Sequence, residues 1–203
     1  AASADQEPRI MPPAPIGLPS PVMPKAPVIA PPPPLIEWIV ASDLSGPPPA
    51  REWLVPDMIP MSTVTLLYGD GGTGKSLIAL QLSVATVLGS IWLNRMPLKG
   101  RVLYFSAEDD QNEIHRRLSS IARSYGVQTS DLSALTIANM AGKDALLASV
   151  GKKTGVMSPS KLLSDLETGI MIHKPHLIVL DTLADIYPGN ENDRAQVRHF
   201  VGM

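Results

Sequence analysis

The chain reads Gly69-Asp70-Gly71-Gly72-Thr73-Gly74-Lys75-Ser76 between an apolar run at residues 64–68 and a helical pattern at residues 75–88. This stretch fits G-x-x-x-x-G-K-[ST], the pattern of a phosphate-binding loop between a strand and a helix. Its glycines let backbone N–H groups turn toward phosphate oxygens, and the following helix presents its positive N-terminal end to the same charge. The pattern predicts that residues 69–76 bind a nucleoside triphosphate.

Two side chains of the loop have expected roles. Lys75 should reach the β- and γ-phosphates, and the Ser76 hydroxyl should bind Mg²⁺. The stretch also contains Gly69-x-Gly71-x-x-Gly74, a dinucleotide fingerprint, which requires an acidic residue about 20 positions later. Residues 75–107 contain no Asp or Glu. We therefore favour ATP with Mg²⁺ as the ligand over a dinucleotide.

Two acidic residues at the ends of apolar runs extend the predicted site. Residues 176–180 predict a strand, and Asp181 follows it, where a carboxylate can orient the Mg²⁺ shell. Residues 102–105 predict another strand, followed by Glu108, Asp109 and Asp110. We expect Glu108 to activate the attacking water as general base, whereas Asp109 and Asp110 suit the first turn of the next helix. The alternative is that all three acids only start that helix.

Composition divides the 203 residues into two parts. Of the 21 prolines, 17 lie in residues 1–60, and residues 1–35 predict a Pro-rich disordered linker. The apolar but proline-broken residues 36–60 predict no regular element. From residue 64, apolar runs alternate with helical stretches, which predicts an α/β fold with a mainly parallel sheet flanked by helices. The expected strands are 64–68, 102–105, 135–138 and 176–180, and the expected helices are 75–88, 110–125, 160–173 and one from 193.

Several classes of site are excluded or disfavoured by composition. The chain has no Cys, which excludes a disulfide framework, a thiolate zinc site and a catalytic thiol. A net charge of −2 gives no general attraction for a polyanion, so any nucleic-acid contact must be local. The four histidines have no metal-ligand spacing. No signal peptide or membrane span is expected, and we expect a cytoplasmic protein.

Together the motifs resemble a RecA-like P-loop ATPase of the AAA_25 group, over residues 36–203. The stretches that carry this resemblance are 53–56 (Trp-Leu-Val-Pro), 69–76, 104–109 (Tyr-Phe-Ser-Ala-Glu-Asp), 181–185 (Asp-Thr-Leu-Ala-Asp) and 189–193 (Gly-Asn-Glu-Asn-Asp). The group includes plasmid hexameric replicative helicases of the RepA type. The resemblance assigns Glu108 as the base that activates water and Asp181 as the Walker B acid, and it implies a homo-hexamer with single-stranded DNA as a partner.

The resemblance also implies a fourth strand between the strands at 64–68 and 176–180, as well as an arginine finger and DNA-binding loops. No segment of this chain supplies them, so we expect residues 36–203 to be the N-terminal part of a longer RecA-like ATPase domain. The strands at 64–68 and 176–180 should then not be directly paired.

The expected function is Mg²⁺-dependent ATP binding and hydrolysis by a motor domain, as a helicase or loader in plasmid, phage or mobile-element DNA replication. Two alternatives stay open. One is an ATP-dependent regulatory switch of the clock-like RecA type, and the other is a P-loop phosphotransferase, in which a substrate pocket would replace the water-activating Glu108.

Overall fold

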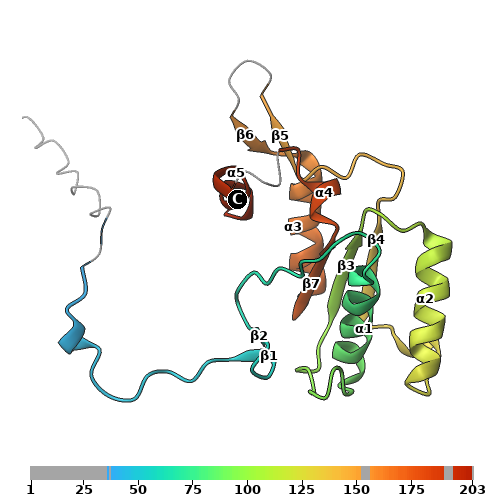
Figure 1. The fold of residues 1–203 in the computed structure, drawn as a ribbon, viewed down its shortest axis with the longest axis horizontal. Coiled ribbons are helices and arrows are strands. Elements are labelled where there is room, and N and C mark those ends of the chain that lie inside the picture. Colours follow the sequence, from blue (N-terminus) through green and yellow to red (C-terminus); the bar gives the residue numbers. More distant parts are fainter. Residues whose placement is uncertain (1–35, 37, 152–155, 190–193, 203) are drawn as a thin grey trace, which may run out of the picture. The chain divides into compact units, whose positions relative to one another are not determined.

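A computed structural model describes residues 36, 38–151, 156–189 and 194–202 (Figure 1). The chain divides into two units, Ala1–Pro48 and Pro49–Met203. The described residues of the first unit are all exposed and contain one short 3-10 helix, η1 (Ala41–Asp43). The predicted disordered linker, residues 1–35, lies outside the described residues. The functional motifs all belong to the second unit.

The centre of the second unit is a parallel sheet of three strands in the order β4 (Leu135–Asn139), β3 (Val102–Ser106) and β7 (Leu177–Asp181). The register aligns the last residues of the strands, so that Ser106 lies opposite both Asn139 and Asp181. The carboxyl ends of all three strands therefore meet at one edge, which is where parallel α/β sheets bind ligands. The expected α/β class is confirmed.

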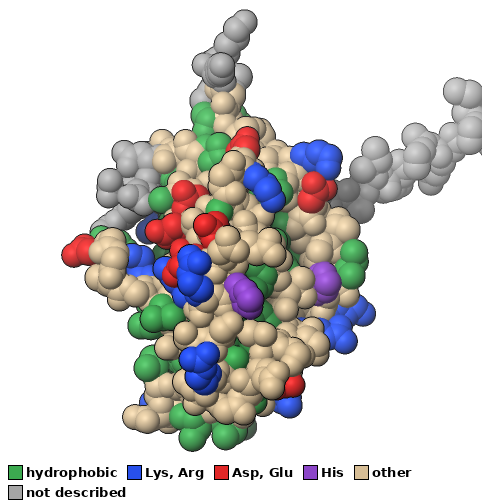
Figure 2. All heavy atoms as spheres, turned by 90° about the vertical axis from the view of Figure 1, so that its right-hand side faces the viewer, with side chains coloured by type: hydrophobic (Ala, Val, Ile, Leu, Met, Phe, Trp, Pro, Cys, Tyr) green, Lys and Arg blue, Asp and Glu red, His purple; other side chains and the backbone are tan. Residues whose placement is uncertain are grey.

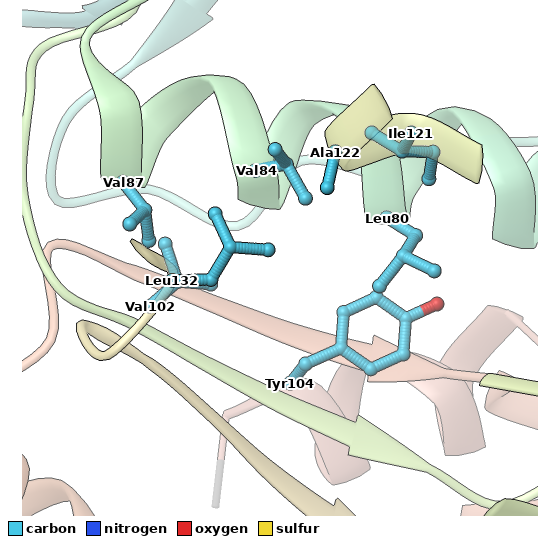
Figure 3. Packing of buried hydrophobic residues seen from close by; sticks show 8 residues of the cluster. All are labelled: Leu80, Val84, Val87, Val102, Tyr104, Ile121, Ala122 and Leu132. Atoms are coloured by element: carbon cyan, nitrogen blue, oxygen red, sulfur yellow. The ribbon is translucent and has the colours of Figure 1, made fainter. Parts of the chain in front are cut away.

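Helices cover both faces of this sheet (Figure 1). On one face, Val102 and Tyr104 of β3 pack against α1 (Lys75–Leu88) and α2 (Gln111–Ser124), as Figure 3 shows. On the other face, Leu103 and Phe105 pack with residues of α3 (Lys161–His173) and α4 (Leu183–Ile186). All five residues of β3 are buried. The alternation of side chains along a strand thus places the core on both sides of β3.

The helix ends follow from individual residues. Gly74 and Gly89, both with positive φ, flank α1. The Asp110 side chain accepts a hydrogen bond of 2.8 Å from the N–H of Glu113 and caps α2. The Ser160 hydroxyl caps α3 in the same way through the N–H of Leu163. Such caps satisfy backbone donors that the first turn leaves unpaired. The helices predicted at 75–88, 110–125 and 160–173 agree with these bounds to within a residue at each end.

Two short hairpins were not predicted. The expectation of no regular element in residues 36–60 is wrong, because β1 (Trp53–Val55) and β2 (Ile59–Pro60) pair antiparallel. Leu54 and Val55 are buried against α1 and Trp92, which holds this proline-flanked segment in place. The second hairpin joins β5 (Ala148–Val150) and β6 (Met157–Pro159). The remaining elements are η2 (Thr129–Asp131) and α5 (Arg194–Val201), near the start predicted at 193.

The predicted strand at residues 64–68 is also wrong. These residues belong to no strand, and the side chains of Val64, Leu66 and Tyr68 are exposed. In the described part of the chain, β7 pairs only with β3, and no strand supplies a hydrogen-bonding ladder for residues 64–68. An apolar run without a ladder partner leaves its backbone groups unpaired and does not form a strand. Residues 64–68 do not pair with β7, but because they form no strand, the expected order of these two strands in the sheet stays a prediction.

Candidate functional site

The glycine-rich loop leads into the N-terminus of α1. Gly72 and Gly74 have φ values of 74° and 85°, which are strained for any residue with a side chain. The Thr73 hydroxyl donates to the carbonyl oxygen of Asp70 at 2.7 Å and closes the loop. No side chain caps α1, and its first turn has no acidic residue. The N–H groups and the positive dipole end are therefore left to an anion such as a phosphate.

Lys75 lies folded over this loop. Its ammonium group donates hydrogen bonds of 2.8 Å to the carbonyl oxygens of Gly69 and Asp70. The side chain is partly buried, so the positive charge stays within the loop rather than extending into solvent. Phosphate oxygens could replace either carbonyl as an acceptor, because an ammonium group with three donors adapts readily to a new partner.

Asp181, the last residue of β7, lies beside the first turn of α1. The Ser76 hydroxyl donates to its Oδ1 atom at 3.0 Å. Asp181 is buried, with only 7% of its surface exposed. Hydroxyl and carboxylate oxygens are the ligands that Mg²⁺ prefers, and Mg²⁺ commonly takes only one or two from the protein and the rest from phosphate and water. The donor set of Ser76 and Asp181 therefore fits this ion.

Larger metal centres are absent from the part of the chain that the structure describes. No group of three or more His, Cys, Asp or Glu side chains lies close enough to hold an ion there. A divalent cation at Ser76 and Asp181 would consequently depend on oxygens from a bound phosphate, as the P-loop arrangement requires.

Sequence reasoning missed Tyr104, which completes the surroundings of Asp181. Its hydroxyl donates to Oδ2 of Asp181 at 2.7 Å and lies 3.4 Å from the carbonyl oxygen of Ser76. Burial is the main cause that raises the pKa of the phenol, and the hydrogen bond to Asp181 and the charge of Asp181 raise it further. The available signal was a tyrosine two positions before the end of a buried strand, on the face that Ser106 and Asp181 share.

The three acidic residues after β3 separate into different environments. Asp110 is the N-cap of α2, as expected of a helix-start acid. Glu108 is exposed and follows the carboxyl end of β3. The expectation that Asp109 lies in the first turn of the helix is wrong, because it precedes the N-cap and its carboxylate forms an ion pair with Arg117. Of these three acidic residues, Glu108 is therefore the one that is exposed and does not cap the helix.

Asp109 also joins the ends of two strands. Its carbonyl oxygen accepts hydrogen bonds from the Asn139 amide at 3.0 Å and the Ser106 hydroxyl at 3.3 Å. Burial raises the pKa of the Asp109 carboxyl and Arg117 opposes that shift, while the negative charge of Asp181 adds to it. Arg117 therefore offsets the negative charge that two acidic groups place near the same edge of the sheet.

Charges on the outer face of α2 are mixed in sign. Glu113 pairs with Arg116 and Arg117 at 2.8 Å, and the Arg116 and Arg117 hydrogen bonds lower the pKa of its carboxyl. Figure 2 shows basic and acidic side chains intermixed on the face viewed there. Such a surface offers no extended positive stripe for a nucleic acid backbone.

A family model described as an AAA domain, AAA_25, matches residues 30–203. The matched stretch contains the glycine-rich loop, Glu108 and Asp181. Among the described residues, the structure contains no helix with the length and apolar character needed to span a membrane.

Proposed function

Because the chain belongs to the AAA_25 family of AAA domains, we propose that its loop binds ATP together with Mg²⁺ and that the site hydrolyses the bond between the β- and γ-phosphates. The family supports a nucleotide-binding, ATPase-type function. The observation that carries the proposal is the 3.0 Å hydrogen bond between Ser76 and Asp181 at the start of α1. It joins a hydroxyl and a carboxylate of two distant segments next to an uncapped helix N-terminus.

Each residue of the site has a role in this reaction. Backbone N–H groups of residues 69–76 hold the phosphates, and Lys75 neutralises the charge on their β- and γ-oxygens. Mg²⁺, when bound, would offset the charge that develops on the phosphate oxygens. Ser76 and Asp181 would hold that ion. Glu108 takes the proton of the attacking water, for which an exposed carboxylate at the sheet edge is suitable.

We further propose that ATP hydrolysis drives a motor that acts on single-stranded DNA, as a helicase or a loader in the replication of a plasmid, phage or mobile element. The support is the resemblance of residues 69–76, 104–109 and 181–185 to hexameric replicative helicases. In this proposal the active form is a homo-hexamer. The mixed charges of the α2 face suggest that DNA contacts are made elsewhere.

The test measures phosphate release by the complete protein with ATP, with and without Mg²⁺ and with and without single-stranded DNA. We expect turnover that requires Mg²⁺ and that falls at least about tenfold in Ser76→Ala and in Asp181→Asn. Asp165→Asn, which removes an exposed carboxylate of α3, is the matched control. Absence of Mg²⁺-dependent ATP binding and turnover would overturn the ATPase proposal.

The DNA arm distinguishes the motor from its alternatives. Single-stranded DNA should raise turnover several-fold if the site belongs to a DNA motor. Turnover that is slow and indifferent to DNA would instead favour the regulatory switch. Transfer of the phosphoryl group to an added acceptor rather than to water would favour a phosphotransferase.

A further inference from the structure

We infer that Tyr104 is a positioning residue of this site, which holds the Asp181 carboxylate in the orientation needed to bind the divalent cation. The inference rests on the proposed function. It adds to the site a residue that belongs neither to the loop motif nor to the two acidic residues, Glu108 and Asp181. Its basis is the 2.7 Å hydrogen bond from the Tyr104 hydroxyl to Oδ2 of Asp181.

The two oxygens of Asp181 are held from different elements. Ser76, in the first turn of α1, donates to Oδ1, and Tyr104 of β3 donates to Oδ2. The Ser76 hydroxyl is itself an expected ligand of the cation, so its bond to Asp181 would be exchanged when the ion binds. The bond from Tyr104 is made by a group that is not an expected ligand. Tyr104 can therefore maintain the orientation of the carboxylate in both states.

The backbone around Asp181 is fixed as well. The N–H of Ala107 donates to the Asp181 carbonyl oxygen at 2.6 Å, and the register places Ser106 opposite Asp181. With the main chain fixed in this way, the remaining freedom of Asp181 is rotation of its carboxylate. Tyr104 restricts that rotation, which makes it a partner of the kind that orients a metal ligand.

The tyrosine ring cannot easily leave this position. Tyr104 is 2% exposed and packs in the cluster with Leu80 and Val84 of α1, and Figure 3 shows its ring next to Leu80. Its hydroxyl also lies 3.4 Å from the Ser76 carbonyl oxygen. Moving the ring would open a cavity between β3 and α1. Tyr104 thus connects the core directly to the cation site.

The test compares Tyr104→Phe with Tyr125→Phe in the full chain. Both changes remove one hydroxyl oxygen, but that of Tyr125 donates to the carbonyl oxygen of Ile91 at 2.9 Å, and Ile91 follows the C-terminal end of α1 rather than the loop at its N-terminus. We expect Tyr104→Phe to raise the Mg²⁺ concentration for half-maximal turnover, and the Mn²⁺ dissociation constant measured by electron paramagnetic resonance on the ATP-bound protein, by about 10- to 100-fold. Affinity for ATP in EDTA should be unchanged, and Tyr125→Phe should match the wild type in every measurement.

The outcomes separate the inference from the function it rests on. If the wild type neither binds nor hydrolyses ATP with Mg²⁺, the proposed function fails and the inference fails with it. If the wild type is Mg²⁺-dependent but Tyr104→Phe has the same requirement for Mg²⁺ and Mn²⁺, the inference alone is overturned. An equal loss of ATP affinity in EDTA would also overturn it, because Tyr104 would then support the fold of the loop rather than the cation site.

A second measurement applies if Tyr104→Phe does not fold. The wild-type chain, with its four tyrosines, is labelled with 3-fluorotyrosine, and the Tyr104 resonance is assigned by elimination from Tyr68→Phe, Tyr125→Phe and Tyr187→Phe. Adding Mg²⁺ to the protein saturated with a non-hydrolysable ATP analogue should shift the Tyr104 fluorine resonance and leave that of Tyr125 in place. A Tyr104 resonance that does not respond to Mg²⁺ would overturn the inference.

Discussion

The hydroxyl of Ser76 donates a 3.0 Å hydrogen bond to the carboxylate of Asp181, although the two residues lie 105 positions apart in the chain. Ser76 is placed by the glycine-rich loop that starts α1, whereas Asp181 is placed by the pairing of β7 with β3. The contact therefore forms only when the helix packs on the sheet in the observed orientation. Its formation makes the proposed cation site a property of the folded domain rather than of either motif alone.

Lys75→Ala should reduce ATP affinity by at least about tenfold, or leave bound ATP unhydrolysed, because it removes the loop's own cation from the β- and γ-phosphates. Binding is measured with a fluorescent ATP analogue, and turnover by phosphate release. Lys161→Ala is the matched control, since Lys161 is an exposed cation at the start of α3. Wild-type turnover in Lys75→Ala would refute the assignment of residues 69–76 as a phosphate site.

Glu108→Gln should lower turnover by about 100-fold or more while ATP affinity stays within about twofold of the wild type. The change keeps the size of the exposed side chain but removes the carboxylate proposed to accept a proton from water. Glu167→Gln, at an exposed position of α3, is the control. If turnover survives and binding weakens instead, Glu108 holds the structure of the loop and is not the base.

The loop and the helix that follows it were predictable because both depend on local sequence. Glycines that permit positive φ, an uncapped helix start and the apolar pattern of residues 75–88 lie within 20 residues of one another. The carboxyl ends of β3 and β7 could also be placed, since parallel strands align their ends at one sheet edge. These regularities were enough to bring Ser76 and Asp181 to the same edge.

Contacts between side chains of separate elements could not be predicted in this way. Nothing in the pattern of β3 distinguishes a Tyr104 that only fills the core from one that also reaches Asp181. The pairing of Asp109 with Arg117 depends on the bend between β3 and α2, so Asp109 was expected to be only a helix-start acid. The run at residues 64–68 has the composition of a strand, but a strand also needs a neighbour, which composition does not reveal.

The ion pair of Asp109 and Arg117 should contribute to stability in a pH-dependent manner. The two side chains are 16% and 31% exposed, so solvent screens their attraction only in part. A double-mutant cycle of Asp109→Asn and Arg117→Gln, measured by urea unfolding, should give a coupling energy of about 1–2 kcal/mol at pH 7. The exposed pair of Lys161 and Asp165 should give less than about 0.5 kcal/mol in the same experiment.

The sign of the pH dependence follows from the raised pKa of Asp109, of which burial is the main cause. The pair exists only while the carboxylate is ionised, so the coupling energy should disappear as the pH falls through that raised pKa, above the usual range of an Asp. The folded state holds the proton of the Asp109 carboxyl more tightly than the unfolded state does. As the pH rises from the ordinary pKa of an Asp to the raised pKa of Asp109, ionisation of this carboxyl therefore lowers the free energy of unfolding. A coupling energy that stays constant from pH 7 to pH 4 would contradict the assignment.

Gly100→Ala should destabilise the domain by about 1–3 kcal/mol, because a methyl group at this position overpacks the junction between β3 and β7. A Cβ atom at Gly100 would lie 2.4 Å from the ring of His176 and 2.7 Å from its Cβ atom. The His176 ring can turn toward solvent, but its Cβ is held by the hydrogen bond of its N–H to the Arg101 carbonyl oxygen. The N–H of Gly100 in turn donates to the Thr86 carbonyl oxygen at 3.0 Å, so the strand cannot simply move away from the new methyl group.

Gly169→Ala is the matched control for that change. Gly169 lies inside α3, and a Cβ atom there would meet nothing within 4 Å. Alanine should stabilise the helix by about 0.5–1 kcal/mol, because it restricts the unfolded chain without a clash in the folded one. Urea unfolding of both variants at pH 7 measures the difference, and the two changes should have opposite signs. Equal effects of the two substitutions would show that the contact between Gly100 and His176 does not limit the packing of β3 against β7.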